Sequence, residues 1–198
     1  MTKEFWNERF AAEDFAYGQE PNALLKNILD KVPAGKILFA AEGEGRNAVY
    51  AATKGWQVYA FDISSAGKQK AEKLASEKNV KIDYELNSFE NYSARENFFD
   101  CIALVFSHLL SQTRRSDFRR LINFLKPGGL LIVIGFSKKQ LGKPSGGPKD
   151  LNMLFSKEQL RSDFVGMKNI SSEEIEMNLD EGPFHKGIAS LIQFTAVK

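Results

Sequence analysis

Short apolar segments alternate with segments of helical spacing along most of the chain. Residues 99–105 and 130–136 are apolar at almost every position, as is typical of central parallel strands covered on both faces. Near the C-terminus, residues 172–178 and 188–197 follow each other without a helix between them, so we expect them to pair antiparallel. The pattern predicts an α/β fold with a doubly wound, mostly parallel seven-stranded sheet and a terminal antiparallel strand. The strands expected before the terminal pair are 37–40, 58–62, 81–86, 99–105 and 130–136.

Capping residues and helix breakers indicate where the helices begin and end. An aromatic-rich arm, residues 2–30, precedes the first strand and is predicted to contain two short helices, the second capped by Asn22. We expect this arm to cover the functional site of a single domain spanning residues 1–198. The other predicted helices begin near Asn47, cover 66–78 with Ser64 or Ser65 as the cap, cover 113–124, and run from Ser156 to about 165.

The segment 137–150 is rich in glycine, proline and lysine. This composition predicts irregular structure, and a loop of this length within one domain is usually functional or mobile. We therefore expect a mobile loop, and we favour a lid over the substrate rather than a plain linker.

Charge argues against a nucleic-acid partner. The formal net charge is only +2, and no basic stripe is interleaved with aromatic residues. Helical spacing places four arginines on or beside the outer face of 113–124, where we expect them to be solvated: Arg114, Arg115, Arg119 and Arg120. A small-molecule partner is the remaining expectation, for a protein that is a monomer or a homodimer.

Cysteine, histidine and the apolar segments set further limits. The single cysteine, Cys101, is expected to be a buried strand thiol and cannot form an internal disulfide. Two histidines make a histidine-rich metal site implausible, so no metal is predicted. The charged N-terminus does not have the apolar core of a signal peptide, and no stretch is long enough for a membrane span, so a cytoplasmic protein without a membrane partner is expected.

The strongest chemical signal lies between the first two strands. Gly43 and Gly45 follow the first strand with one residue between them, which lets the backbone approach a ligand closely. The helix beginning near Asn47 points free N–H groups at the same place, where an anionic group is expected. Asp62 ends the second strand and can accept hydrogen bonds from ribose hydroxyls. Together these features predict a nucleoside site at the carboxyl ends of the strands.

The third strand end extends this site. Asn87, Ser88 and Phe89 follow that strand and are expected to flank an adenine, with polar groups at its edge and a ring or backbone at its face. The glycine pattern alone leaves two kinds of nucleoside open, because Gly43, Gly45 and Ala48 also fit the G-x-G-x-x-G/A pattern of nicotinamide dinucleotide enzymes. The preceding arm, the limited room for a substrate domain and the terminal hairpin argue against an NAD(P)-dependent oxidoreductase. A non-catalytic nucleoside-binding module is the second alternative.

Six short motifs, spread over the whole chain, are informative in combination. They are Tyr17-Gly18-x-x-Pro21-Asn22, Glu42-Gly43-Glu44-Gly45-Arg46-Asn47-Ala48-Val49, Phe61-Asp62-Ile63-Ser64, Leu125-Lys126-Pro127-Gly128-Gly129, Gly146-Gly147-Pro148 and Glu181-Gly182-x-x-His185-x-Gly187-x-Ala189. With these motifs the chain resembles the class I S-adenosylmethionine-dependent methyltransferases. It is most similar to the small bacterial group of tellurite-resistance and thiopurine-type methyltransferases.

The resemblance implies S-adenosyl-L-methionine as cofactor, S-adenosyl-L-homocysteine as product, and methyl transfer to a small-molecule nucleophile. A thiol or an oxyanion of sulfur, selenium or tellurium is among the acceptors it suggests. The anion at the helix start would then be the methionine carboxylate. The implied cofactor-binding residues are Tyr17, Ala41, Glu42, Gly43, Gly45, Asn47, Asp62, Ile63, Asn87, Ser88, Phe89 and Phe106.

The chain departs from the family pattern at the first strand. Phe39 stands where the family usually has an acid, and Ala41 where it has the first glycine. Glu42 supplies an acid further along, and it is expected to orient the ammonium group of the ligand directly or through a water.

Catalytic candidates lie at the fourth strand end, in the turn before the last strand and in the loop after the first strand. The candidates are His185, His108 and Arg46, with Trp6 and Tyr17 of the arm as further substrate contacts. A neutral histidine near pH 7 can take a proton from the nucleophile. A soft anionic nucleophile would need no base, and a cationic residue to position it would suffice. Methyl transfer also depends on alignment of the reacting atoms and exclusion of water.

Overall fold

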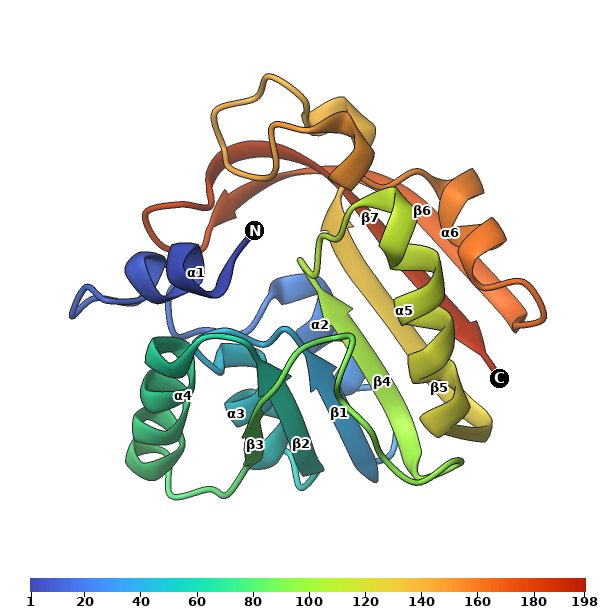
Figure 1. Ribbon diagram of the computed structural model, residues 1–198, viewed down its shortest axis with the longest axis horizontal. Coiled ribbons are helices and arrows are strands. Elements are labelled where there is room, and N and C mark those ends of the chain that lie inside the picture. The colour runs from blue at the N-terminus through green and yellow to red at the C-terminus, as the bar shows by residue number, and fades with distance from the viewer.

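The computed structural model describes residues 1–198 and contains one seven-stranded sheet (Figure 1). The strand order is β3-β2-β1-β4-β5-β7-β6; the first five strands are parallel, and β7 pairs antiparallel with both β5 and β6. The expected fold class is confirmed. The strands are β1 (Lys36–Ala40), β2 (Gln57–Asp62), β3 (Asp83–Leu86), β4 (Phe99–Val105), β5 (Leu125–Phe136), β6 (Lys168–Asp180) and β7 (Lys186–Val197).

The helices begin close to the predicted capping residues. Asn22 accepts hydrogen bonds from Leu24 N and Leu25 N, and Ser64 and Ser156 cap their helices in the same way. The helices are α1 (Lys3–Arg9), α2 (Ala23–Leu29), α3 (Arg46–Thr53), α4 (Ser65–Glu77), α5 (Ser111–Phe124) and α6 (Lys157–Asp163), with short 3-10 helices at Lys138–Gln140 and Leu151–Met153. None of these helices has the length and apolar character needed to cross a membrane.

Two apolar clusters cover the two faces of the sheet. Alternate residues of β1, β2 and β4 pack either against α2, α3 and α4 or against α5 and α6. Phe39, which replaces the acid expected in the first strand, is 1% exposed and belongs to the cluster under α2 and α3. Cys101 is completely buried in the same cluster, as predicted, and burial raises the pKa of its thiol.

The structure corrects several element boundaries. The Lys-Pro-Gly-Gly segment after α5 does not precede β5 but lies inside it, where the pairing with β4 shifts between Phe99 and Cys101. β6 begins at Lys168, earlier than predicted, and β3 is shorter than predicted. A bulge or a longer edge strand leaves little signal in the hydrophobic pattern, which explains these errors.

Arg114 is not solvated as predicted. It is 1% exposed, and its Nε donates to Asp163 Oδ2 at 2.8 Å, across the contact between α5 and α6. Its neighbour Arg115 is exposed, as expected. Helical spacing places Arg114 on the same face as the buried Phe118 and Leu121. Its position therefore indicated burial, but we expected solvation because arginine is charged.

The segment 137–150 is held by buried polar contacts. Gln140 Oε1 accepts from Ser190 N at 2.8 Å, and Ser145 Oγ donates to Ile188 O at 2.7 Å, so both hydrogen bonds tie the segment to β7. A 3-10 helix also occurs at its start, where irregular structure was predicted. Whether the segment closes as a lid stays a prediction.

The N-terminal arm has a loosely packed outer part. None of the residues of α1 is buried, and its side-chain link to α4 is made by Asn7, whose Oδ1 accepts from Ser64 Oγ at 2.8 Å. Phe10, which directly follows α1, is buried at the base of the arm. The arm lies beside the β6–β7 turn (Figure 1), so two segments far apart in sequence meet at one edge of the sheet.

Candidate functional site

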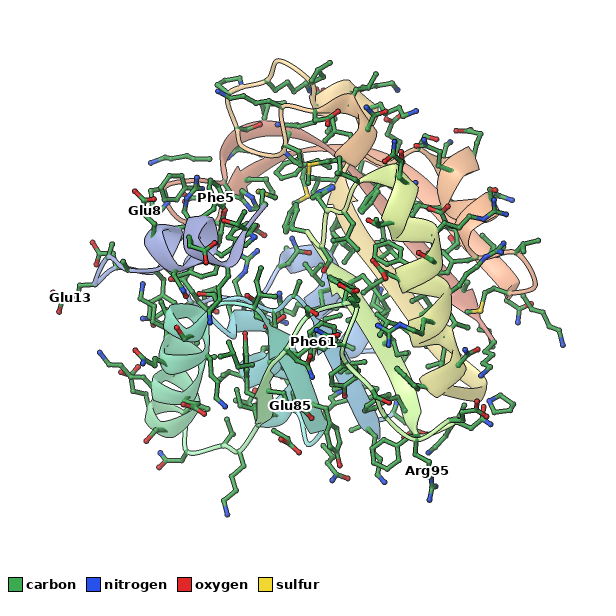
Figure 2. The ribbon with its side chains drawn as sticks, in the orientation of Figure 1. Phe5, Glu8, Glu13, Phe61, Glu85 and Arg95 are labelled. Carbon is green, nitrogen blue, oxygen red and sulfur yellow. The ribbon has the colours of Figure 1, made fainter.

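A cavity of about 440 Å³ lies where the strand order reverses between β1 and β4. This is the position at which doubly wound sheets bind ligands. Its walls come from the arm, the loop after β1, the ends of β2, β3 and β4, and the β6–β7 turn; Phe5 and Phe61 in Figure 2 mark the arm and β2 walls. The predicted site residues that line it are Tyr17, Ala41, Glu42, Gly43, Arg46, Asn47, Asp62, Ile63, Asn87, Ser88, Phe89, Phe106, His108 and His185.

Gly45 is the predicted site residue that does not line the cavity. Its φ of +85° is a conformation that glycine adopts most easily, and a Cβ on it would lie 2.4 Å from Ala71 Cβ. Gly45 therefore permits α3 to begin tightly against α4. Its predicted contact with the cofactor stays a prediction.

Asp62 fixes the loop after β1. Its Oδ2 accepts from Gly43 N at 3.0 Å and its Oδ1 from Ser64 N at 2.8 Å. Burial raises the pKa of this carboxyl, which the backbone hydrogen bonds partly oppose. A Cβ on Gly43 would lie 3.0 Å from Phe10, so the glycine lets the arm lie close over the loop. The predicted ribose contact of Asp62 stays a prediction, in a place that the cavity reaches.

The start of α3 is already bound to a carboxylate. Glu42 Oε1 accepts from Asn47 N at 2.9 Å and from Ala48 N at 2.7 Å. The expectation that a ligand anion, such as a methionine carboxylate, occupies this helix start is therefore wrong for this structure. Burial raises the pKa of Glu42 to about 7, although the two backbone donors act in the opposite direction.

Two residues of the cavity wall adopt left-handed backbone conformations. Ala41 has φ +55° and Phe106 has φ +54°, and neither is a glycine. Such conformations cost of order 1–3 kcal/mol and gather at functional sites. They place the ends of β1 and β4 at the cavity.

The end of β3 closes the side of the cavity assigned to adenine. Asn87 Oδ1 accepts from Ser88 N at 2.9 Å, which forms a compact polar turn. The ring of Phe89 packs edge-on to Phe61 with centroids 5.4 Å apart. These residues present amide, hydroxyl and aromatic groups together, as the adenine hypothesis requires.

Arg46 links the arm to the β6–β7 turn. Its Nη1 donates to Tyr17 O at 3.0 Å and its Nη2 donates to Glu181 Oε2 at 2.9 Å. Asn22 Nδ2 also donates to Glu181, at 2.8 Å. Because both ends of the guanidinium are engaged, Arg46 is a clamp between elements, and the expectation of a catalytic Arg46 is not supported by this geometry.

His185 has one ring nitrogen bound and one free. Its Nδ1 lies 3.3 Å from Glu181 Oε2, which is the only hydrogen bond of the ring to the protein, so Nε2 is left free. Burial lowers the pKa of His185, against the effect of Glu181. Burial would raise the pKa of Glu181, but the contacts with His185 and Arg46 hold it at about 2. Glu181 therefore stays ionised. Burial keeps the imidazole neutral, and of the two neutral tautomers Glu181 favours the one with its proton on Nδ1.

His108 has no free nitrogen, which corrects its assignment as a catalytic residue. Its Nδ1 lies 2.8 Å from Met153 O, and its Nε2 accepts from Phe136 N at 3.0 Å. Burial lowers the pKa of His108 to about 4, so the ring is neutral at pH 7. His108 ties the segment 151–153 to the end of β5, and only its ring contributes to the cavity wall.

Several residues of the site were not singled out from the sequence. Glu44 accepts from Ala16 N and Tyr17 N and pairs with Lys70 at 2.8 Å, which anchors the inner part of the arm. Glu181 stands four residues before His185 in a glycine-containing turn, and this spacing could have indicated that the two side chains interact.

Arg9 stacks on Phe184 at 3.8 Å and donates to Tyr17 Oη at 3.2 Å, and it makes no ion pair. No three His, Cys, Asp or Glu side chains are grouped so that they could hold a metal ion.

Comparison with known proteins relates this chain to one fold. A family model described as a methyltransferase domain matches residues 37–129, from β1 into β5. A comparison with curated protein sequences gives no significant match.

Solved structures share the fold at low sequence identity. A protein solved in work on the conversion of a disulfide bond into a thioacetal group during echinomycin biosynthesis is 14% identical, with a TM-score of 0.79 over 100% of this chain and 92% of that one. TehB from Haemophilus influenzae is also 14% identical, with a TM-score of 0.72 over 99% of this chain and 66% of that one. A S-adenosylmethionine-dependent methyltransferase from Methanosarcina mazei is 16% identical, with a TM-score of 0.68 over 90% and 98% of the two chains. The fold is the Rossmann-like fold of class I methyltransferases.

Proposed function

We propose that this protein is a methyltransferase that moves a methyl group from S-adenosyl-L-methionine to a small-molecule nucleophile. The observation that carries the proposal is the cavity at the β1–β4 switch point, which is lined by Glu42 and Asp62 together with nine aromatic side chains. The methyltransferase-domain match over residues 37–129 supports it.

The residues present fit this cofactor better than a dinucleotide. A sulfonium and an ammonium are cations, and carboxylates and aromatic rings are the groups that attract them. A dinucleotide instead needs the start of the first helix for its pyrophosphate. In this chain Glu42 binds Asn47 N and Ala48 N there, so a pyrophosphate would meet a carboxylate. The nicotinamide alternative is therefore not favoured.

The chain supplies positioning and an enclosed site. S-adenosylmethionine, when bound, supplies an electrophilic methyl group on its sulfonium. Asp62 would hold the ribose, and Asn87, Ser88 and Phe89 would hold the adenine. Trp6 and Phe10 of the arm line the cavity and would limit the access of water to the reacting atoms.

The acceptor half of the cavity combines a base with a cation. His185 presents Nε2 as an acceptor for the proton of a nucleophile, and Glu181 orients the ring through Nδ1. Arg9 lies at the same end of the cavity without an acidic partner. This pair suits a nucleophile that is anionic or becomes so, and we propose a thiol or an oxyanion of sulfur, selenium or tellurium as acceptor. Two of the solved structures, the protein from the work on echinomycin biosynthesis and TehB, are consistent with this choice, and both are related to this chain in fold only.

Calorimetry tests the cofactor directly. Purified protein is titrated with S-adenosylmethionine, S-adenosylhomocysteine and NADH, and then release of S-adenosylhomocysteine is followed with sulfide, an aromatic thiol, selenite and tellurite. Binding of the two sulfur nucleosides with turnover of at least one acceptor is expected. Binding of NADH alone would overturn the proposal, and binding of the sulfonium without turnover of any nucleophile would favour a non-catalytic module.

Asp62→Asn is expected to weaken S-adenosylhomocysteine binding by at least roughly tenfold, because the charge-assisted bonds to the ribose are lost. Asparagine keeps one oxygen for the backbone donors Gly43 N or Ser64 N, so the loop is retained better than with alanine. Titration calorimetry measures the affinity, and the melting temperature without ligand serves as the folding control. Unchanged affinity in a folded variant contradicts the ribose assignment.

Arg9→Gln is expected to raise KM for an anionic acceptor by roughly tenfold, because the unpaired guanidinium no longer attracts it. Glutamine keeps a polar side chain of similar reach without the charge. Arg9→Lys, which restores the charge, is the matched control and should recover most of the loss. The same rise in KM for an uncharged acceptor would show that Arg9 only packs on Phe184.

A further inference from the structure

Gln140 is a buried side chain of the segment 137–150, and its amide is fully engaged. It is 1% exposed. Its Nε2 donates to Ser145 Oγ and to Gly146 O, both at 2.9 Å, and its Oε1 accepts from Ser190 N of β7 at 2.8 Å. A buried amide bound in this way is held in one position, because breaking any of these bonds leaves a buried polar group without a partner. Gln140 therefore fixes Gly146 relative to β7.

Gly146 lies directly against the ring of His185. A Cβ on Gly146 would lie 2.8 Å from His185 Cδ2 and would overlap Phe184 O. The φ of +111° at this glycine is also one that residues with a side chain rarely adopt. In an imidazole Cδ2 is bonded to Nε2, so the glycine borders the edge of the ring that carries the free nitrogen. Glu181 holds the opposite edge through Nδ1, at 3.3 Å.

Aromatic side chains surround the same ring. The ring centroids of Tyr17 and Phe106 lie 4.4 Å from that of His185, and the centroid of Phe136 lies 5.0 Å away. Apolar packing is not directional, so these contacts limit the movement of the ring without selecting where Nε2 points. The direction of Nε2 then depends on what holds the two edges of the ring.

Other contacts anchor the segment without Gln140. Ser145 Oγ donates to Ile188 O at 2.7 Å, and the backbone N–H of Ser137 donates to β7. The bond from Gln140 to Gly146 O is different in kind, because Gly146 makes no other hydrogen bond within the protein. What Gln140 adds is therefore the position of this glycine rather than the attachment of the segment.

We propose that Gln140 is a positioning residue for His185, because it holds Gly146 against the Cδ2 edge of the ring. Together with Glu181 at the other edge, this contact directs Nε2 toward the acceptor. The inference rests on the proposed function, in which His185 takes the proton of the nucleophile. A displacement of the reacting groups by about 1 Å can cost roughly 10²-fold in rate, so a side chain that does not itself line the cavity can affect turnover.

Gln140→Met tests this role, because it keeps the length of the side chain and removes all three hydrogen bonds. Ser145→Ala is the matched control, since it loosens the same segment and leaves Gln140 bonded to Gly146 O. Gln140→Asn, whose amide is one methylene closer to the backbone, takes the place of Gln140→Met if that variant does not fold. Melting temperatures report the folding of each variant.

NMR of the imidazole nitrogens at neutral pH reports the state of His185 in the protein without ligand. The chain has two histidines, so few signals are expected, and His185→Ala assigns them. We expect the tautomer protonated on Nδ1 in the unaltered protein and in Ser145→Ala, and a mixture of both neutral tautomers in Gln140→Met. His108, bound through both nitrogens, should not change. The same single tautomer in Gln140→Met would contradict the proposal.

Single-turnover rates separate positioning from a general weakening of the segment. With a protonated thiol acceptor, Gln140→Met should react roughly 10–10²-fold more slowly than the unaltered protein, with normal affinity for S-adenosylhomocysteine. Ser145→Ala should stay close to the unaltered rate. The loss in Gln140→Met should be small for an acceptor that is already anionic. It should be absent when Gln140→Met is added to His185→Ala, since residues that act as a unit are not additive.

Three outcomes would assign Gln140 to anchoring alone and overturn its positioning role. They are an equal loss for both acceptors, an equal loss in Ser145→Ala, and an undiminished loss in the double variant with His185→Ala. If the unaltered protein moves no methyl group to any acceptor, the proposed function has failed, and the NMR comparison still decides whether Gln140 positions the ring.

Discussion

His185→Ala lowers turnover of a protonated acceptor by roughly 10²–10⁴-fold, the range that general-base catalysis supplies, and leaves cofactor affinity close to normal. The expected result follows from the free Nε2 of a ring whose Nδ1 is held by Glu181 at 3.3 Å. Single-turnover rates with a thiol acceptor, together with calorimetry for S-adenosylhomocysteine, measure the two effects separately.

The pH dependence of turnover shows whether His185 acts as a general base or only as a packing residue. Because the pKa of His185 is lowered, the neutral form that accepts a proton persists below the ordinary histidine range. The rate is expected to stay level from pH 8 to pH 6.5 and to fall only at lower pH. An acceptor that is already anionic should lose much less in His185→Ala. Full turnover of a protonated acceptor by the folded variant would show that His185 only packs against Tyr17 and Phe106.

Glu181→Gln tests how the charge of Glu181 affects His185. Glutamine can still meet Arg46 and Nδ1, but it no longer carries the charge that favours the tautomer with a free Nε2. Turnover should fall less than in His185→Ala, and the pH profile should shift to lower pH by less than one unit, because the imidazolium loses the carboxylate that stabilises it while burial persists. A pH profile identical to that of the unaltered protein would assign Glu181 a purely structural role.

Arg114→Ala is expected to destabilise the protein by about 3–5 kcal/mol, because it leaves Asp163 as an unpaired buried charge. The two side chains are 2% and 7% exposed, so solvent does little to relieve the loss. For a chain of this size the melting temperature should fall by about 10 °C. Urea unfolding followed by circular dichroism measures the free energy.

Two further variants test whether the buried ion pair between Arg114 and Asp163 accounts for the loss of stability. Arg115→Ala, at the exposed neighbouring position, should change stability by no more than about 0.5 kcal/mol. The double variant Arg114→Met with Asp163→Leu removes both charges and should recover most of the loss, as apolar replacement of buried pairs commonly does. A cost below about 1 kcal/mol for Arg114→Ala would contradict the assignment of a buried pair.

The fold was largely predictable, because buried strands and amphipathic helices leave periodic patterns in the sequence and the rules for their connections limit how the strands can be arranged. The location of the site could be predicted as a set of strand ends, because the carboxyl ends of the parallel strands meet near the point where the strand order reverses. Asp62 ends β2 and Phe106 directly follows β4, and both line the cavity.

Hydrogen-bond partners were the part that could not be predicted. His108 and His185 are equivalent candidates in the sequence, and what separates them is contact with Met153 and Phe136, 45 and 28 residues away from His108. Gly45 depends in the same way on Ala71 of α4. Long-range packing of this kind leaves no local pattern that could be used in advance.

The arm divides into two parts of unequal stability. Ala16 and Asn22 are tied by buried hydrogen bonds to Glu44 and Asn47, whereas no residue of α1 is buried. Opening of α1 therefore breaks few contacts and can occur by local unfolding, while the inner part follows the global transition. In hydrogen exchange, amides of α1 would lose protection first, and ligands would reach the cavity through an opening that leaves the walls around Tyr17 intact.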